Sequence, residues 1–257
     1  MKIFIKRKYL FWPLVALFLT PLALQAEDKK PPSLAESWVV TVKDGMQDEF
    51  EKAFTDHMKA RKKAGDPRAW QIYVPHTGES LNHYIIRYCC FNWADRDAYS
   101  AWGEKSKISE HWNKNVDPYV ANYQHQYSRI DHENGNWKNS ETGYKFVGVQ
   151  KFKLKADSRA SKSVAAISKM AKDMKWDRSW GWSYSVTGPE VLMLVFPYEN
   201  FAAMEPPKVS FREAAIKHMK SEEKVDKMFD DFDSNFKSSS YTIYMHLPEL
   251  SMEQEKK

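Results

Sequence analysis

The spacing of apolar and polar residues predicts two similar sets of elements, one in each half of the chain. In the first half, two-residue alternation or short apolar runs predict strands at residues 38–43, 70–74, 83–88 and 123–130. Phe50, Phe54 and Met58 recur every four residues, which predicts a helix after the first strand. Helical spacing returns through Trp102 and over residues 109–116, and Asp95 is the expected N-cap. The first half therefore reads strand, helix, strand, strand, helix, strand.

The second half repeats this order. Its strands are predicted at residues 144–154, 180–184, 191–196 and 241–245. A helix with Val164, Ile167 and Met170 on one face follows the first of these strands, and a helical region from Phe211 to Phe236 precedes the last. The order β-α-β-β-α-β is that of the ferredoxin-like, or split βαβ, unit.

A ferredoxin-like unit carries helices on one face of its sheet, so the other face needs a cover. Two copies in one chain can cover each other. We therefore expect an α+β protein with two tandem ferredoxin-like (β-α-β-β-α-β) units packed sheet to sheet as a pseudo-dimeric α/β barrel. The repeats are predicted at residues 36–132 and 144–247, with a linker at 133–143 and a charged tail at 248–257.

Local sequence around the third strand agrees with this architecture. The strand Ile85-Ile86-Arg87-Tyr88 leads into Phe91-Asn92-Trp93-Ala94-Asp95-Arg96-Asp97-Ala98-Tyr99, and residues 196–204 hold a weaker version of the pattern. This arrangement resembles the antibiotic-biosynthesis-monooxygenase and NIPSNAP-like branch of the dimeric α/β-barrel superfamily, here as a single-chain pseudo-dimer. The resemblance implies the fold over nearly the whole chain after residue 35. Its motifs are too degenerate to imply an activity.

The first residues have the features of a secretory signal peptide at residues 1–26, followed by a short linker at 27–35. Lys2, Lys6, Arg7 and Lys8 precede an apolar run, and Ala26 is suited to the cleavage position. The alternative is a retained membrane anchor, but the run is short for a span of about 20 residues. We expect a periplasmic or secreted protein without a stable membrane span after cleavage.

Removal of that segment changes the charge of the chain. The sequence has 39 basic and 34 acidic residues, and four of the basic ones lie before residue 27. The exported part is therefore nearly neutral, so we expect no nucleic-acid partner.

Cys89 and Cys90 are the two cysteines of the chain. Neighbours on a strand point to opposite faces, so a bond between them would need a strained turn. We expect two small buried thiols, with intermolecular pairing as the alternative. No Cys/His spacing indicates a metal site.

Strand alternation also suggests where a ligand could bind. Tyr73, His83, Arg87, His125, Tyr127 and Arg129 are the candidate ligand-binding residues, because histidine, tyrosine and arginine together suit an aromatic or anionic molecule. The alternative is that these side chains line a packed sheet or face water. We predict no cofactor. Haem, which some relatives of this barrel bind through a histidine, is a minor alternative because no motif selects an axial histidine.

Six of the eight histidines lie in the first half, so we expect any ligand site there. The favoured function is an exported cell-envelope protein that binds a small aromatic or anionic molecule in its first repeat. A cofactor-independent monooxygenase-like enzyme acting on a small aromatic substrate is the first alternative. A structural or interaction module is the second. No catalytic triad, phosphate-binding loop or CxxC motif decides between them.

Overall fold

The computed structural model describes residues 31–138 and 144–252. The predicted signal peptide at residues 1–26 lies outside the described residues, as do parts of both predicted linkers and the last five residues.

The elements follow the predicted order. The first half contains β1 (Leu34–Val42), α1 (Gln47–Lys63), β2 (Gln71–Pro75), β3 (His83–Phe91), α2 (Trp93–Ser106), α3 (Ile108–Asn115) and β4 (Val120–Asn136). The second half contains β5 (Phe146–Leu154), α4 (Ala160–Asp173), β6 (Trp180–Ser185), β7 (Val191–Tyr198), α5 (Phe211–Met219), α6 (Glu222–Asp233) and β8 (Phe236–His246).

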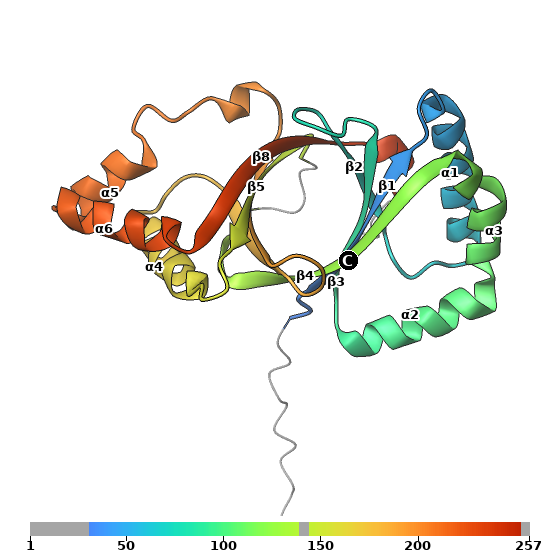
Figure 1. The fold of residues 1–257 in the computed structure, drawn as a ribbon, viewed down its shortest axis with the longest axis horizontal. Helices are drawn as coiled ribbons and strands as arrows, with labels where there is room; N and C mark the ends of the chain where they lie inside the picture. Colours follow the sequence, from blue (N-terminus) through green and yellow to red (C-terminus); the bar gives the residue numbers. More distant parts are fainter. Residues whose placement is uncertain (1–30, 139–143, 253–257) are drawn as a thin grey trace, which may run out of the picture. The chain divides into compact units, whose positions relative to one another are not determined.

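All the strands join into one closed antiparallel barrel in the order β1-β3-β2-β8-β5-β7-β6-β4. The helices lie outside the barrel, with α1 to α3 over the strands of the first half and α4 to α6 over those of the second (Figure 1). Pairing of β2 with β8 and of β4 with β6 closes the ring. The predicted α+β class and the predicted barrel are confirmed.

The apolar cores lie between the barrel and its helices, on the outer face of the strands. Val40, Phe50 and Ile72 belong to the core of the first half. Trp182 and Leu192 belong to that of the second. Burial of these faces gives the main favourable free energy of folding. Side chains on the other face of each strand point into the barrel lumen.

Local signals explain the helices. Phe50, Phe54 and Met58 form the buried stripe of α1, as predicted. Acidic residues in its first turn and basic residues in its last turn suit the helix dipole. Helix α2 begins with a capping box between Asn92 and Asp95, so the N-cap is Asn92 rather than the expected Asp95. In the described part of the chain, no helix combines the length and apolarity needed to cross a membrane.

Two segments are more ordered than the sequence suggests. Strand β4 continues to Asn136, within the predicted linker, because Asn136 is paired with Trp180 of β6. The start of the predicted charged tail packs against β2, where the Ile72 amide donates to Ser251 and the Met252 amide donates to the Trp70 carbonyl. Backbone pairing stabilises both segments.

Candidate functional site

A buried carboxylate lies at the centre of the polar site in the first half. Glu36 of β1 is 2% exposed and points out of the barrel toward α2. One carboxylate oxygen, Oε2, pairs with Arg68 and lies 3.7 Å from Nε of Arg96. The other oxygen, Oε1, lies 2.8 Å from Nε2 of His125. Three basic side chains thus converge on one acid.

These partners keep Glu36 ionised. Burial by itself raises the pKa of the carboxyl, because a charge is poorly solvated inside a protein. Hydrogen bonds from His125 and Arg68, with the charges of Arg68 and Arg96, outweigh burial and leave the pKa below its ordinary value. Glu36 is therefore an acceptor that holds its donors in place.

Arg68 lies just before β2 and is 3% exposed. Its guanidinium carbon lies 3.8 Å from the ring centroid of Tyr99 and 4.5 Å from that of Phe91. Such cation–π contacts stabilise a desolvated guanidinium. Nη2 of Arg68 has no hydrogen-bond partner among the described residues. Arg68 thus neutralises Glu36 from the closed side of the site.

His125 forms the open side. Its ring stacks on Trp38, with centroids 3.9 Å apart and planes 10° from parallel, and the side chain is 28% exposed. Because Glu36 is ionised, we assign the ring proton to Nε2, which donates to the carboxylate. Nδ1 is then an acceptor, and no described residue forms a hydrogen bond to it. A histidine oriented by a carboxylate in this way can act as a general base.

Arg96 and Tyr127 lie beside His125. Nε of Arg96 donates to the Tyr127 hydroxyl at 2.8 Å, and Nη1 donates to Ser100 at 2.5 Å. Burial lowers the pKa of Arg96, but the bond to Tyr127 and the charge of Glu36 outweigh it, so the net shift is upward. With Arg68 and Arg96 facing one carboxylate, the site has a positive charge that can attract an anion.

An aromatic surface adjoins these groups. Trp93, the first residue of α2, is 48% exposed. Its ring lies edge-on to Tyr127, with centroids 5.3 Å apart, and Tyr127 meets the ring of His125 at 4.8 Å. Exposed tryptophan beside a cation suits a ligand that is both aromatic and acidic.

A second polar layer supports α1 and α2 behind the site. Arg61 pairs with the buried Asp66 at 2.7 Å, and both contact the Tyr99 hydroxyl. Nη1 of Arg61 donates to Nε2 of His57, whose Nδ1 lies 3.2 Å from Nδ1 of His111. Burial, followed by the charge of Arg61, lowers the pKa of His57 to about 3. His57 is therefore a neutral packing residue at ordinary pH.

The structure divides the six predicted ligand-binding residues between the two faces of the sheet. His125, Tyr127 and Arg129 lie on the outer face, while Tyr73, His83 and Arg87 lie on the lumen face. They do not form one cleft. His125 and Tyr127 belong to the Glu36 site, whereas Arg129 is exposed and has no ion pair with Glu36.

Sequence reasoning missed Glu36, Arg68 and Arg96. The predicted first strand began at Trp38, whereas β1 begins at Leu34 and so includes Glu36. The available signal was a charged residue on a strand face that is otherwise apolar. Arg68, which follows the break at Gly65, had no local signal of its own.

The expectation of two buried thiols is wrong. Cys89 and Cys90 form a disulfide, and Cys89 is exposed. The register of β3 against β1 shifts here, because Leu34 pairs with Phe91 whereas Ala35 pairs with Cys89. Cys90 is the extra residue of a bulge, so simple alternation of side chains fails at this point.

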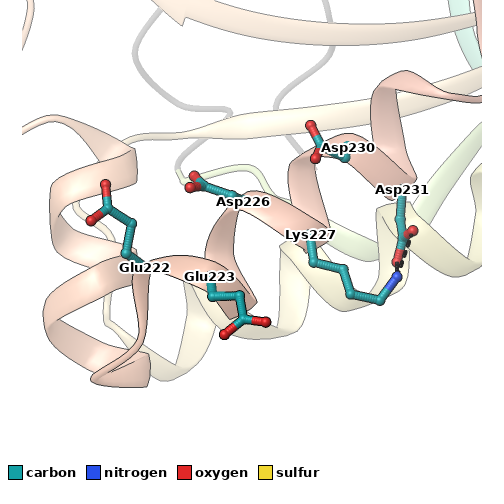
Figure 2. Close-up of a pocket in the computed structure, with 6 residues that line it drawn as sticks. All are labelled: Glu222, Glu223, Asp226, Lys227, Asp230 and Asp231. Carbon is teal, nitrogen blue, oxygen red and sulfur yellow. Dashed lines mark hydrogen bonds and ion pairs between the residues drawn. The ribbon is translucent and has the colours of Figure 1, made fainter.

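Surface hollows elsewhere contain ordinary solvated charges. Figure 2 shows one on α6, lined by Glu222, Glu223, Asp226, Asp230, Asp231 and Lys227. Lys227 pairs with Asp231 at 3.1 Å, and Arg212 pairs with Asp226. Another hollow lies near Lys138 and Arg178. Within residues 31–138 and 144–252, no group of three His, Cys, Asp or Glu side chains is placed to hold a metal ion.

Several histidines have ring nitrogens that are already engaged, while Nδ1 of His125 has no hydrogen-bond partner among the described residues. His125 gives Nε2 to Glu36, His57 lies against His111, and His246 bonds to Gln71. Three others are engaged or placed differently: His132 bonds to a backbone carbonyl, His76 packs between Phe146 and Phe201, and His218 lies exposed on α5. His83 points into the barrel lumen. No histidine lines either surface hollow described above.

Comparison with known proteins identifies the architecture alone. No protein-family model and no curated protein matches the sequence. A presumptive monooxygenase from Lactobacillus acidophilus NCFM has a similar structure, with TM-score 0.53, 11% identity and coverage of 84% of this chain and 94% of that one. An anthrone oxidase-like protein gives TM-score 0.51 and 7% identity, with coverage of 85% and 92%.

A chlorite dismutase from Candidatus Nitrospira defluvii is also similar in structure. It gives TM-score 0.53 and 5% identity, with coverage of 86% of this chain and 94% of that one. Structural similarity at such low sequence identity indicates a shared fold, and it does not indicate a shared reaction. The likeness supports the barrel with helices outside it, which is the fold of the dimeric α/β-barrel proteins.

Proposed function

We propose that this chain is an exported cell-envelope protein that binds a small aromatic acid at the Glu36 site. The observation that carries the proposal is the arrangement around one buried carboxylate: Glu36 fixes His125, while Arg96 remains at the open edge. The acidic group of the ligand would meet Arg96 and Nδ1 of His125, and its ring would lie against Trp93. Each of these contacts uses a group that is already oriented by the fold.

Two features support the finer parts of this proposal. The strand runs β4-β1-β3-β2 and β8-β5-β7-β6 have the same order, which supports two tandem ferredoxin-like repeats in one chain. A disulfide at Cys89 and Cys90 supports an oxidising compartment outside the cytoplasm. Export itself rests on the signal-like residues at the start of the sequence.

The binding test uses 1-hydroxy-2-naphthoate as the probe, with isothermal titration calorimetry as the readout. Arg96→Gln and His125→Asn should each weaken binding about tenfold or more, as expected for loss of a hydrogen bond to a charged ligand. Lys105→Gln removes an exposed charge from the same helix and should leave affinity unchanged. Equal affinity for all four proteins, or no binding to the wild type, contradicts the proposal.

A monooxygenase-like activity is the second candidate, because His125 has the orientation of a general base. Nδ1 would remove a proton from an acidic substrate, and Arg96 would stabilise the resulting anion. That anion would reduce dioxygen directly: one oxygen atom enters the substrate and the other leaves as water. The monooxygenase and anthrone oxidase-like structural neighbours make this reaction class reasonable to test.

Oxygen consumption with a panel of quinols and anthrones tests the enzymatic candidate. Turnover should fall at least about a hundredfold in His125→Asn, which is the usual contribution of a general base. Turnover that is unaffected by this substitution, or absent with every compound, removes the enzymatic candidate and leaves the binding proposal intact.

A further inference from the structure

The inner face of the barrel differs from its outer face in packing. On β3, the outward-facing Tyr84 and Ile86 are buried, whereas the inward-facing His83, Ile85 and Arg87 retain accessible surface. The same alternation occurs on β2, where Ile72 is buried and its inward-facing neighbours are not. On β2 and β3 the helix side is therefore the more tightly packed, whereas on β1 the inward-facing Ala35 and Ser37 are also buried.

The lumen is also polar and basic. Register places these charged or histidine side chains on its inner face: Arg87, His83, Lys151, Lys153 and His246. The inward positions of the described strands contain no aspartate or glutamate. The part of the chain after residue 26, which is close to neutral, thus places an excess of positive charge inside the barrel.

Arg87 lies in the middle of β3, between β1 and β2. It is paired in register with Ser37 on one side and Gln71 on the other. Its Nη1 donates to the Ser37 hydroxyl at 3.2 Å, and no described carboxylate forms an ion pair with it. Burial lowers its pKa, with an opposing effect from Tyr73. A partly buried guanidinium is stabilised by an anionic partner, because it has lost part of its hydration.

The other lumen cations do not supply that partner. Nζ of Lys151 lies 3.4 Å from the Tyr244 hydroxyl. Burial, followed by the positive charge of Lys151, lowers the pKa of His83. Neither Lys151 nor His83 therefore supplies a negative charge to Arg87.

We propose that the barrel lumen binds a small oxyanion or carboxylate, held by the guanidinium of Arg87 with the hydroxyls of Ser37 and Tyr73. Guanidinium presents two parallel N–H donors to such an anion, and the hydroxyls add neutral donors beside it. This site is separate from the Glu36 site, since the two occupy opposite faces of the same strands. It does not depend on the function proposed for the Glu36 site.

The test measures binding of inorganic phosphate and, separately, acetate to the whole exported chain in a low-chloride buffer. Isothermal titration calorimetry gives the affinity, and thermal unfolding gives an independent readout. The wild type should bind at least one of the two anions and unfold at a higher temperature in its presence. Arg87→Gln should weaken that binding about tenfold or more and remove the thermal shift. Arg129→Gln removes an exposed arginine from the outer face and is the matched control.

Without added anion, Arg87→Gln should unfold at a temperature no lower than the wild type, because it removes an uncompensated charge. If that variant fails to fold, Arg87→Lys keeps the charge without the paired donors, and its affinity should still fall. Binding that is lost equally in Arg129→Gln would indicate general charge attraction and overturn the proposal. Absence of binding by the wild type to both anions would also overturn it.

Discussion

Nε2 of His125 lies 2.8 Å from Oε1 of Glu36, although the two residues are 89 positions apart in the sequence. Antiparallel pairing of β1 with β4 creates this contact, since Glu36 is opposite Tyr127 and Trp38 is opposite His125. The acid is buried and the histidine is partly exposed. Glu36 thus connects the protein interior to the edge of the candidate site.

Replacing Glu36 with glutamine should destabilise the protein strongly. The amide removes the negative charge, which leaves the guanidinium of Arg68 buried without its counterion. Loss of one partner of a buried ion pair costs about 3–5 kcal/mol of unfolding free energy. Urea denaturation measures this change, with Glu104→Gln on the exposed face of α2 as the control. A loss no greater than that of the control would show that the carboxylate is structurally dispensable.

The pair Glu36 and Arg68 should be replaceable together more easily than singly. Arg68 is surrounded by aromatic rings, so an apolar side chain can fill its position. The double variant Glu36→Leu/Arg68→Met should therefore be more stable than either single variant. The coupling energy, which is the difference between its loss and the sum of the two single losses, should be about 1–3 kcal/mol. A double-mutant cycle in urea measures this coupling. Simple additivity of the two losses would mean that the pair does not interact as the structure indicates.

Stability should fall as the pH drops below 6.5, and His57 should cause much of the loss. The unfolded histidine gains a proton near its ordinary pKa of 6.5, whereas the folded one does so only near pH 3. Protons therefore favour the unfolded state across this interval, by up to about 1.4 kcal/mol per pH unit. His57→Gln should flatten the dependence between pH 6 and pH 4.5. His218→Gln, at an exposed position, should keep the wild-type slope; equal slopes in all three proteins would refute the assignment.

Export can be checked from the mass of the protein recovered outside the cytoplasm. Cleavage after Ala26 should give a mature chain beginning at Glu27. Intact-mass analysis of periplasmic and membrane fractions distinguishes this product from a retained anchor. Full-length chain found only in the membrane fraction would support the anchor alternative.

The fold was easier to predict than the site. Short stretches of sequence predict the fold, whereas the site combines residues that are far apart in the sequence. Period-two and helical spacings are local, and they predicted the element order and the barrel. The Glu36 site combines residues from β1, the loop before β2, α2 and β4, so no local pattern reveals it. His125 and Tyr127 were found because they alternate on one strand. Glu36 was missed because the predicted strand started at Trp38, four residues after the true start of β1 at Leu34.

The two cysteines and the lumen show a further limit of strand alternation. Alternation correctly separates Arg87 from Tyr88 on β3, but it fails at Cys90, where the strand bulges. It also cannot tell which face is covered by helices and which faces the lumen. Tyr73 and His125 were therefore both predicted as ligand-binding residues, although they lie on opposite faces of the sheet.

The most direct test of the account is a long-range ¹H–¹⁵N spectrum of histidine-labelled protein, recorded with and without 1-hydroxy-2-naphthoate. His125, assigned by its loss in His125→Asn, should show a proton on Nε2 in the free protein, and its Nδ1 resonance should shift when the probe is added. His218 and His132 should not change. A His125 resonance that stays constant at saturating probe, or that reports a proton on Nδ1 in the free protein, would contradict the proposed site.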